Sequence, residues 1–295
     1  MKLSIASVKE LSEESVGISG PDSGTRAFHS NDSKLYALFS APWELHMGAT
    51  YYGKLQIGPS DAEPQEKIEI PEFKEPRFLI PQCYQPWTSD NNSVLLLTYD
   101  APPVLYNCRS RKTRRLLIKE TVHAAAICSP EYDMAFLLNY GNTAHFLTLK
   151  ADLRPSLSFP LPAQQTRAFW FGDCVLILRQ DRKPARIQLY HMDSSTPVAD
   201  IAIDPSKIAP FDTEKFKKLK KTHSVLKWKS SYMSGTLLDI WERVSFDRGR
   251  MALRLSIMRP LGEPYMTDGI EPGSRPELIC EVAPLWVEIT LESLD

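Results

Sequence analysis

The amino-acid sequence predicts an all-β protein built from a repeated unit of four short strands. The clearest copy spans residues 122–161, where apolar segments at 122–128 and 134–138 precede an alternating segment at 144–149 and a short one at 157–161. The turns between these segments contain Ser129, Pro130, Asp133, Gly141 and Asn142, which are residue types that favour turns. Four strands in about forty residues is typical of one blade of a β-propeller.

The unit recurs along the chain. An upstream copy begins at 89–93 and continues through 94–97, 104–106 and 116–118, and a downstream copy covers 170–203. The turn residues Asp90, Asp133 and Asp173 lie about 40 residues apart, which matches the period of propeller blades. A first, longer copy begins in a turn that contains Asp32 and continues into an apolar segment at 35–39.

The apolar pattern differs between strands as a propeller requires. The second segment of each copy is apolar on both faces, as at 94–97, 134–138 and 174–178, whereas the third alternates. A strand covered on both faces is continuously apolar, and a strand with one face in water alternates. The connections are about two to six residues long, which suits hairpins. They are too short for the crossovers of a parallel α/β sheet, so antiparallel sheets are predicted.

One turn carries a resemblance to known repeat proteins. The segment from Ser129 to Phe136 reads Ser-Pro-Glu-Tyr-Asp-Met-Ala-Phe and resembles the Ser-Pro-Asp-Gly turn and following strand of WD40-like and YVTN-like β-propellers. The resemblance is to a degenerate repeat architecture over residues 25–290, because no Trp-Asp dipeptide closes any blade and no Gly-His occurs. It implies a circular all-β platform of the kind commonly used for binding.

We therefore predict a single β-propeller domain over residues 1–295, with five blades or, alternatively, six. Strand-like segments at 3–8 and 285–291 are expected to pair and close the ring, which removes an exposed edge. The last blade is expected at 223–228, 237–241, 251–258 and 277–282. Residues 204–222 interrupt the rhythm as an inserted loop, which is predicted to contain one short helix with Asp212 as its N-cap.

Composition limits the possible functions. Hydrophobic residues make up 43% of the chain and charged residues 24%, which is ordinary for a globular protein with a sizeable core. The net charge of −1 gives no overall field that would attract nucleic acid or an anionic membrane. The cysteines lack paired spacing, which predicts buried thiols rather than disulfides or a zinc site. With no evident signal peptide or apolar run of about 18 residues, a cytoplasmic protein without a membrane span is expected.

No motif identifies a reaction. Asp32, Asp90, Asp133 and Asp173 suggest paired carboxylates of the glycosidase type, but aspartates in turns also bond their own backbone. The turn interpretation is preferred because all four occupy one position of the repeat. The histidines show no metal-ligand spacing, and nucleophile-elbow and phosphate-loop motifs are absent. No catalytic residue, metal or cofactor is therefore predicted.

Three basic clusters have the residue types that bind phosphate. They are Arg109, Arg111, Lys112, Arg114 and Arg115; Arg179, Arg182, Lys183 and Arg186; and Lys215, Lys217, Lys218, Lys220 and Lys221. Charge runs in turns and on exposed helices are commonly solvated surface, which is the preferred interpretation. The Lys-rich segment 215–221 also lies close to two phenylalanines, a mixture that favours nucleic-acid binding.

Loop length and composition predict a partner-binding face. In a four-stranded blade, the connection between strands two and three and the connection to the next blade emerge on the same side. This rule gathers eight residues that combine aromatic anchors with positive charge: Trp43, Tyr51, Tyr52, Phe73, Arg182, Lys183, Lys217 and Lys218. The opposite face receives the four turn aspartates and the basic turn 109–115.

The sequence is therefore interpreted as a non-catalytic interaction module or scaffold that binds a protein partner through loops on one propeller face. One alternative is a carbohydrate-active or other hydrolytic propeller enzyme. The other is a nucleic-acid-binding adaptor that uses segment 215–221.

Overall fold

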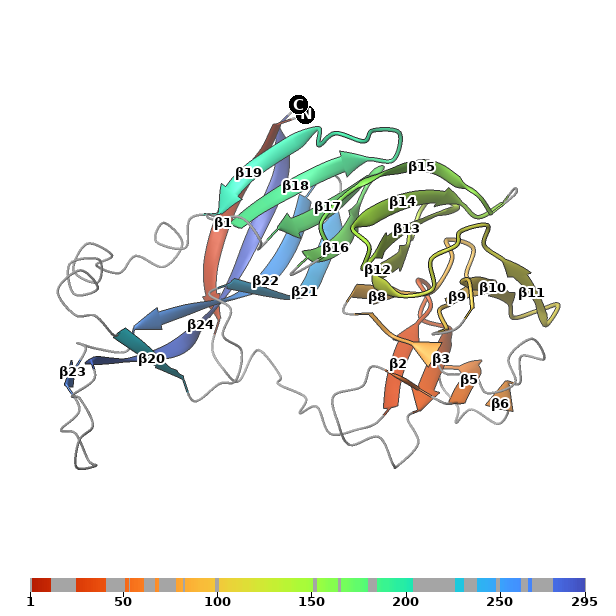
Figure 1. Cartoon of the computed structure of the whole chain (residues 1–295), viewed down its shortest axis with the longest axis horizontal. Helices are drawn as coiled ribbons and strands as arrows, with labels where there is room; N and C mark the ends of the chain where they lie inside the picture. The colour runs from red at the N-terminus through yellow and green to blue at the C-terminus, as the bar shows by residue number, and fades with distance from the viewer. Residues whose placement is uncertain are drawn as a thin grey trace. The chain divides into compact units, whose positions relative to one another are not determined.

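The structure is a computed structural model of the whole chain (Figure 1). It describes residues 2–11, 25–40, 51–52, 54–60, 67–68, 78–81, 83–98, 101–150, 153–163, 166–179, 185–203, 226–230, 238–247, 250–260, 265–266 and 278–294. These residues form strands and turns and contain no helix, so the predicted all-β class is confirmed. The predicted helix in 204–222 lies outside the described residues.

The chain forms two compact units. Unit 1 comprises Met1–Ile18, Arg182–Arg186 and Ile201–Asp295, and unit 2 comprises Ser19–Asp181 and Ile187–Asp200. The interpretation of residues 1–295 as one domain stays a prediction.

Unit 2 contains a series of small sheets that follow one another in chain order. The first has the order β2-β3-β5-β6 and consists of Thr25–His29, Leu35–Ser40, Lys54–Pro59 and Lys67–Ile68. A two-stranded ladder, β4 (Tyr51–Tyr52) with β7 (Phe78–Leu79), accompanies it. The next sheet has the order β11-β10-β9 and consists of Lys112–Arg115, Val104–Asn107 and Ser93–Leu96.

The two following sheets are the most regular. One has the order β15-β14-β13-β12-β8 and consists of Pro155–Pro160, Thr143–Thr148, Met134–Asn139, His123–Cys128 and Cys83–Gln85. The other has the order β16-β17-β18-β19 and consists of Thr166–Phe171, Cys174–Arg179, Ala185–His191 and Ala199–Ile203. The predicted strands of the 122–161 unit therefore match β12 to β15 to within a few residues.

The segment around β8 links two of these sheets. β8 pairs in parallel with β12, with Cys83 opposite Ala125. Immediately afterwards, Trp87 bridges to Val94 of β9 in antiparallel fashion, and the Leu95 amide donates to the Pro86 carbonyl at 2.8 Å. The same stretch of chain is thus the first strand of the β9–β11 sheet and a lateral neighbour of β12.

A repeated hydrogen bond joins each first strand to the first strand of the preceding sheet. Its donor is always the residue that pairs with the second residue of the next strand: Trp87 with Val94, Cys128 with Ala135 and Trp170 with Val175. The three bonds run from Trp87 Nε1 to Phe28 O at 2.7 Å, from Cys128 Sγ to Pro86 O at 3.5 Å, and from Trp170 Nε1 to Ile127 O at 3.1 Å.

The acceptors of these bonds are equivalent as well. Phe28, Pro86 and Ile127 each directly precede the donor position of their own strand, since His29 pairs with Tyr36 as Trp87 pairs with Val94. Three successive junctions therefore use one geometry, although the donor is an indole at two of them and a thiol at the third.

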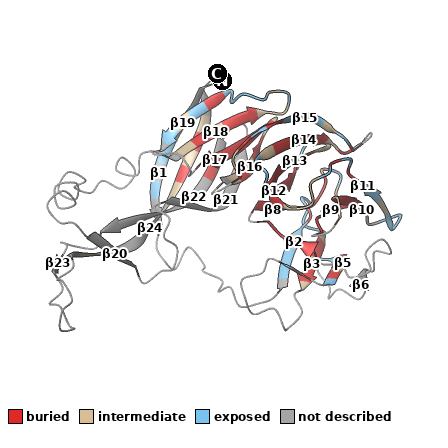
Figure 2. Ribbon diagram, in the orientation of Figure 1, coloured by how far each residue is buried: buried red, intermediate tan, exposed pale blue. Residues whose placement is uncertain are grey.

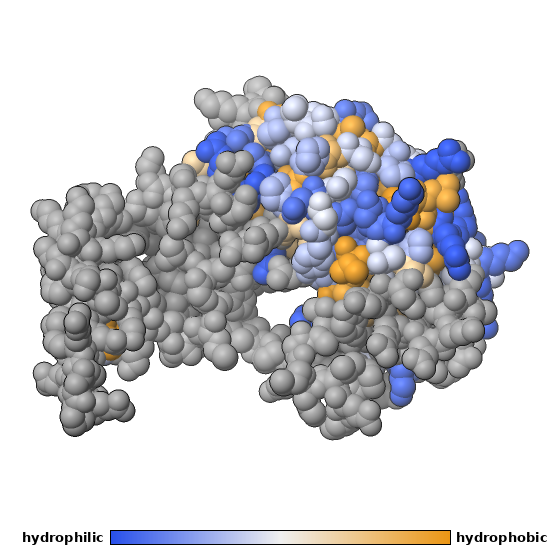
Figure 3. Space-filling model, in the orientation of Figure 1, coloured by the Kyte–Doolittle hydropathy of each residue, from blue (hydrophilic) through white to orange (hydrophobic). Residues whose placement is uncertain are grey.

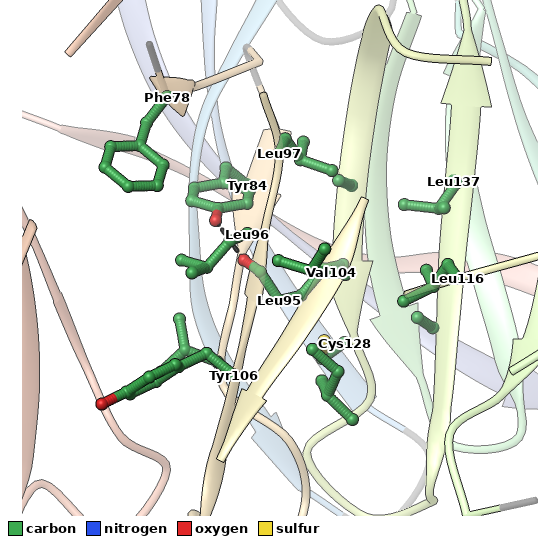
Figure 4. Packing of buried hydrophobic residues seen from close by; sticks show 14 of the residues in the cluster. Phe78, Tyr84, Leu95, Leu96, Leu97, Val104, Tyr106, Leu116, Cys128 and Leu137 are labelled. Atoms are coloured by element: carbon green, nitrogen blue, oxygen red, sulfur yellow. Dashed lines mark hydrogen bonds between the residues drawn. The ribbon is translucent and has the colours of Figure 1, made fainter. Parts of the chain in front are cut away.

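The core of unit 2 follows the apolar pattern of the sequence. Every residue of β9, β12 and β17 is buried, as are all but the first of β13 (Figure 2). One large cluster packs Phe78, Tyr84, Leu95 and Leu137 together, and the buried Tyr84 hydroxyl donates to the Leu95 carbonyl (Figure 4). The two-sided burial predicted for the second strands is thus confirmed for β9, β13 and β17, whereas β3 has Leu35 and Leu38 only partly buried.

Unit 1 departs from the short-strand pattern. Its sheet follows the order β1-β24-β22-β21, with Lys2–Leu11, Leu278–Leu294, Arg250–Pro260 and Leu238–Asp247. β20 (Leu226–Ser230) and β23 (Tyr265–Met266) also pair with β24. The predicted pairing of the two ends is confirmed, because β1 runs antiparallel to β24 from Lys2 opposite Leu294 to Leu11 opposite Trp286.

Two segments predicted as separate strands, 277–282 and 285–291, are one strand of 17 residues. Pro284 lies inside this strand, although a proline cannot donate to a ladder. Among the described pairs, however, Pro284 lies opposite Met258 of β22, while pairing with β1 stops at Trp286 and pairing with β20 stops at Val282. A proline is tolerated where one side of a strand needs no donor.

Candidate functional site

Most of the predicted partner-binding residues lie outside the described residues: Trp43, Phe73, Arg182, Lys183, Lys217 and Lys218. The exceptions are Tyr51 and Tyr52, which form β4 and pair with Leu79 and Phe78 of β7. The proposed face around these eight residues therefore stays a prediction.

The turn aspartates have a structural task. Asp32 accepts hydrogen bonds from the Ser30 hydroxyl at 2.7 Å and the Lys34 amide at 3.2 Å. The Ser30 hydroxyl also accepts from the Leu35 amide at 2.9 Å. The Ser30 hydrogen bond, followed by that of Lys34, lowers the pKa of Asp32, because hydrogen bonds to a carboxylate favour its ionised form.

The turn before β9 repeats this arrangement. Asp90 accepts from the Thr88 hydroxyl at 2.7 Å and the Asn92 amide at 3.0 Å, and the Thr88 hydroxyl accepts from the Ser93 amide at 3.1 Å. Burial opposes ionisation of Asp90, but the hydrogen bonds from Thr88 and Asn92 outweigh it, so the pKa is lowered. The turn interpretation is confirmed for both aspartates.

Neighbouring turns are also bonded to one another. The Asn31 amide donates to Asn91 Oδ1 at 2.8 Å, and the Ser89 hydroxyl donates to Asp133 Oδ1 at 2.8 Å. Asp133 also forms an ion pair with Lys150 of the β14–β15 turn. The turns of three successive sheets thus lie side by side, and the predicted placement of this face opposite Trp43 stays a prediction.

Three of the described cysteines, Cys108, Cys128 and Cys174, offer no reactive thiolate. Cys83, Cys108, Cys128 and Cys174 are reduced thiols. Burial raises the pKa of Cys108 and of Cys174 to about 12, and it raises the pKa of Cys128 further. A nucleophilic or metal-binding cysteine needs a thiolate at neutral pH, and no three His, Cys, Asp or Glu side chains of the described ranges gather closely enough to hold a metal ion.

A buried histidine pair lies in the β12–β15 sheet. His123 is fully buried, and neither ring nitrogen forms a well-aligned hydrogen bond, although the Glu120 main chain lies close enough to favour the protonated ring. His145 Nδ1 lies 2.8 Å from the Ser158 hydroxyl, and its Nε2 lies 3.7 Å from Glu120 Oε2. Burial lowers the pKa of His123 to about 4 and also lowers the pKa of His145. Both imidazoles are therefore neutral at pH 7, which suits a structural role.

The β10–β11 hairpin presents a concentration of positive charge. Its turn is shaped by Asn107, whose side chain accepts from the Ser110 amide at 2.8 Å, and Arg111 occupies the left-handed region with φ 55°. We call the exposed cations of this hairpin and of the segment that follows it the basic surface: Arg109, Arg111, Lys112, Arg114, Arg115 and Lys119. Figure 3 shows strongly hydrophilic surface at this edge of unit 2.

Two contacts bring further cations to the basic surface. Arg114 Nη1 and Nη2 each lie 3.5 Å from a carbonyl oxygen of the β14–β15 turn, those of Leu149 and Lys150. The Leu117 amide donates to the Leu153 carbonyl at 2.9 Å. Lys150 and Arg154 therefore lie beside the hairpin. Sequence reasoning found the cluster 109–115 but missed these two residues, although the third-to-fourth-strand turns of adjacent units were already expected on one face.

Comparisons with known proteins do not place the chain in a family. No family model and no curated protein matches it. Among solved structures, the apo form of AztD from Citrobacter koseri is similar, with a TM-score of 0.42 and 9% identity over 60% of this chain. The match spans 47% of AztD, so this chain corresponds to about half of that protein. No helix of the described ranges has the length and apolar character to cross a bilayer.

Proposed function

We propose that this protein is a non-catalytic β-propeller module that binds a protein partner through loops on one face. The repeated first-strand hydrogen bond supports the propeller, because a ring of blades needs the same relation between neighbours at every junction. Trp87, Cys128 and Trp170 meet this requirement at three consecutive junctions. In the proposed ring, the sheet that pairs β1 with β24 is the fifth blade, and six blades are the alternative.

The observation that carries the non-catalytic assignment is the use of the turn carboxylates. A glycosidase needs one carboxyl group as an acid and a second as a base or nucleophile. Asp32 and Asp90 instead accept hydrogen bonds from their own turns. Asp133 accepts from Ser89 and pairs with Lys150, and Asp173 Oδ2 lies 3.2 Å from His191 Nε2. Lowered pKa values of Asp32 and Asp90 make them poor proton donors at neutral pH.

The proposed partner face is the one predicted from loop length, with Trp43 as an anchor and Lys217 and Lys218 as steering charges. We expect Trp43→Ala, and separately Lys217→Glu with Lys218→Glu, to weaken partner capture from the source cell without lowering the melting temperature.

Two results would contradict this proposal. Normal capture by the Trp43 and Lys217/Lys218 variants would show that the partner does not use this face. Hydrolysis of any member of a glycan panel by the purified protein, abolished by Asp90→Asn, would show that the turn carboxylates are catalytic and would favour the enzyme.

A further inference from the structure

Positive charge is concentrated in one segment of this protein, residues 101–119, although the net charge of the whole chain is close to zero. The whole chain is almost neutral, with 35 basic and 36 acidic residues. Residues 101–119, however, contain six basic residues and no acidic one, and those six are exposed and form the basic surface. Charged side chains on an edge strand discourage edge-to-edge pairing, but Arg109, Arg111 and Lys119 lie outside the edge strand β11. A cluster of one sign also repels itself, so protection of an edge does not account for these six cations.

The shape of the surface is fixed by contacts from both sides. Leu116 and Ile118 are buried, and the Leu116 amide donates to the Pro103 carbonyl at 2.8 Å. On the other side, Arg114 and the Leu117 amide reach the β14–β15 turn. Lys150 keeps Asp133 as a partner, and Arg154 adds an exposed charge beside it. The cations are therefore presented by an ordered backbone, so little ordering is required on binding.

An apolar residue lies within this charge. Leu117 is 54% exposed, more than any other leucine whose burial the structure describes, and it lies between the buried Leu116 and Ile118. The alternation along this extended segment directs the Leu117 side chain outward, between Arg115 and Lys119 in sequence. A ligand that fits must supply anionic groups and, between them, an apolar group.

We propose that the basic surface binds an acidic peptide segment of a partner protein, with carboxylates on Arg109 and Arg115 and one apolar side chain on Leu117. Arginine suits this ligand because its planar fork bonds a carboxylate at two points. Nucleic acid fits less well, because single strands are held by stacking on aromatic side chains, and Tyr106, the one aromatic residue of segment 101–119, is buried. The inference rests on the proposed function as a protein-binding module, to which it adds a second surface and a partner chemistry.

The test uses the full chain and labelled synthetic peptides, with affinity measured by fluorescence anisotropy. The first peptide has two blocks of glutamates around one leucine, the second has serine in place of that leucine, and the third has lysines in place of the glutamates. We expect the first peptide to bind, to weaken as salt rises, and to exceed the second in affinity. The lysine peptide should not bind.

Variants locate the site. Arg109→Glu with Arg115→Glu removes two exposed cations and keeps Arg114, which contacts the β14–β15 turn. This pair of substitutions should lower the affinity for the leucine peptide by about tenfold or more. The control Arg26→Glu with Lys54→Glu makes the same change in net charge and should leave affinity within about twofold. Leu117→Ser should reduce affinity for the leucine peptide to that of the serine peptide and leave the serine peptide unaffected.

Three results would overturn the proposal. The first is equal weakening by the two charge-reversed pairs, which would mean that only overall charge matters. The second is absence of peptide binding at low salt. The third is tighter binding of a single-stranded oligonucleotide through the same arginines without dependence on Leu117, which would assign the surface to nucleic acid. Trp43→Ala should leave peptide affinity unchanged, so failure here is distinguishable from failure of the face around Trp43.

Discussion

Acid should destabilise unit 2 through His123. This side chain is fully buried on β12, opposite Asn139 of β13, and burial lowers its pKa from 6.5 to about 4. The charged groups near it are His145, whose pKa is lowered too, and Glu120, whose carboxylate lies 3.7 Å from His145. An imidazole with a lowered pKa binds its proton more readily in the unfolded chain, so folding stability rises with pH between the two values.

The size of the effect follows from the two pKa values. The stabilisation by neutral His123 is fully present above the unfolded pKa of 6.5 and is lost as pH falls toward the folded value of about 4. Linkage gives a loss of about 2 kcal/mol near pH 5 and about 3 kcal/mol near pH 4, relative to neutral pH. Protonation of His145 adds to the loss in the same direction, because its pKa is also lowered.

Urea unfolding measured at several pH values tests this account. We expect His123→Leu to remove most of the decline in unfolding free energy between about pH 7 and pH 4.5. The same substitution removes two buried ring nitrogens that form no well-aligned hydrogen bond, so stability at neutral pH should not fall by the amount usual for a core change. A decline of the same size in wild type and His123→Leu would refute the reasoning. Leu137→Ala is the control, since it lowers stability but should keep the pH dependence.

Further predictions concern packing, the sheet junctions and the turns. Leu137→Ala should lower the free energy of unfolding by about 2 to 5 kcal/mol, because Leu137 is fully buried in β13; an unchanged urea midpoint would contradict this. Trp170→Phe should lower the free energy of unfolding by about 1 to 3 kcal/mol, because the Ile127 carbonyl loses its indole donor. Differential scanning calorimetry would measure this loss. Asp90→Ala should lower the free energy of unfolding by about 1 kcal/mol, because the Thr88 hydroxyl and the Asn92 amide lose their acceptor. An unchanged free energy of unfolding together with loss of glycan hydrolysis would favour a catalytic role.

The fold class and most strands of unit 2 could be predicted from sequence because their causes are local. Continuous apolar runs predicted β13 and β17, and turn residues predicted the hairpins that join each of these strands to its neighbours. The long β24 could not be predicted, because tolerance of Pro284 depends on which neighbours pair on each side. The same limit applies to the basic surface. Charge at 109–115 is visible in the sequence, but the approach of Lys150 and Arg154 depends on contacts of Arg114 and Leu117 with another sheet.

The first-strand hydrogen bond bears on how such a chain can diverge. Each acceptor is a main-chain carbonyl, which every residue type supplies, so substitution at Phe28, Pro86 or Ile127 leaves it in place. The donor side chain needs only an N–H, O–H or S–H group that can reach this carbonyl. The raised pKa of Cys128 keeps its thiol protonated, so that it can donate. Successive repeats can therefore drift until they share no residue at equivalent sites and still keep the same attachment. A search for such repeats would succeed better by scoring donor capacity at the position opposite the second residue of each following strand than by scoring residue identity.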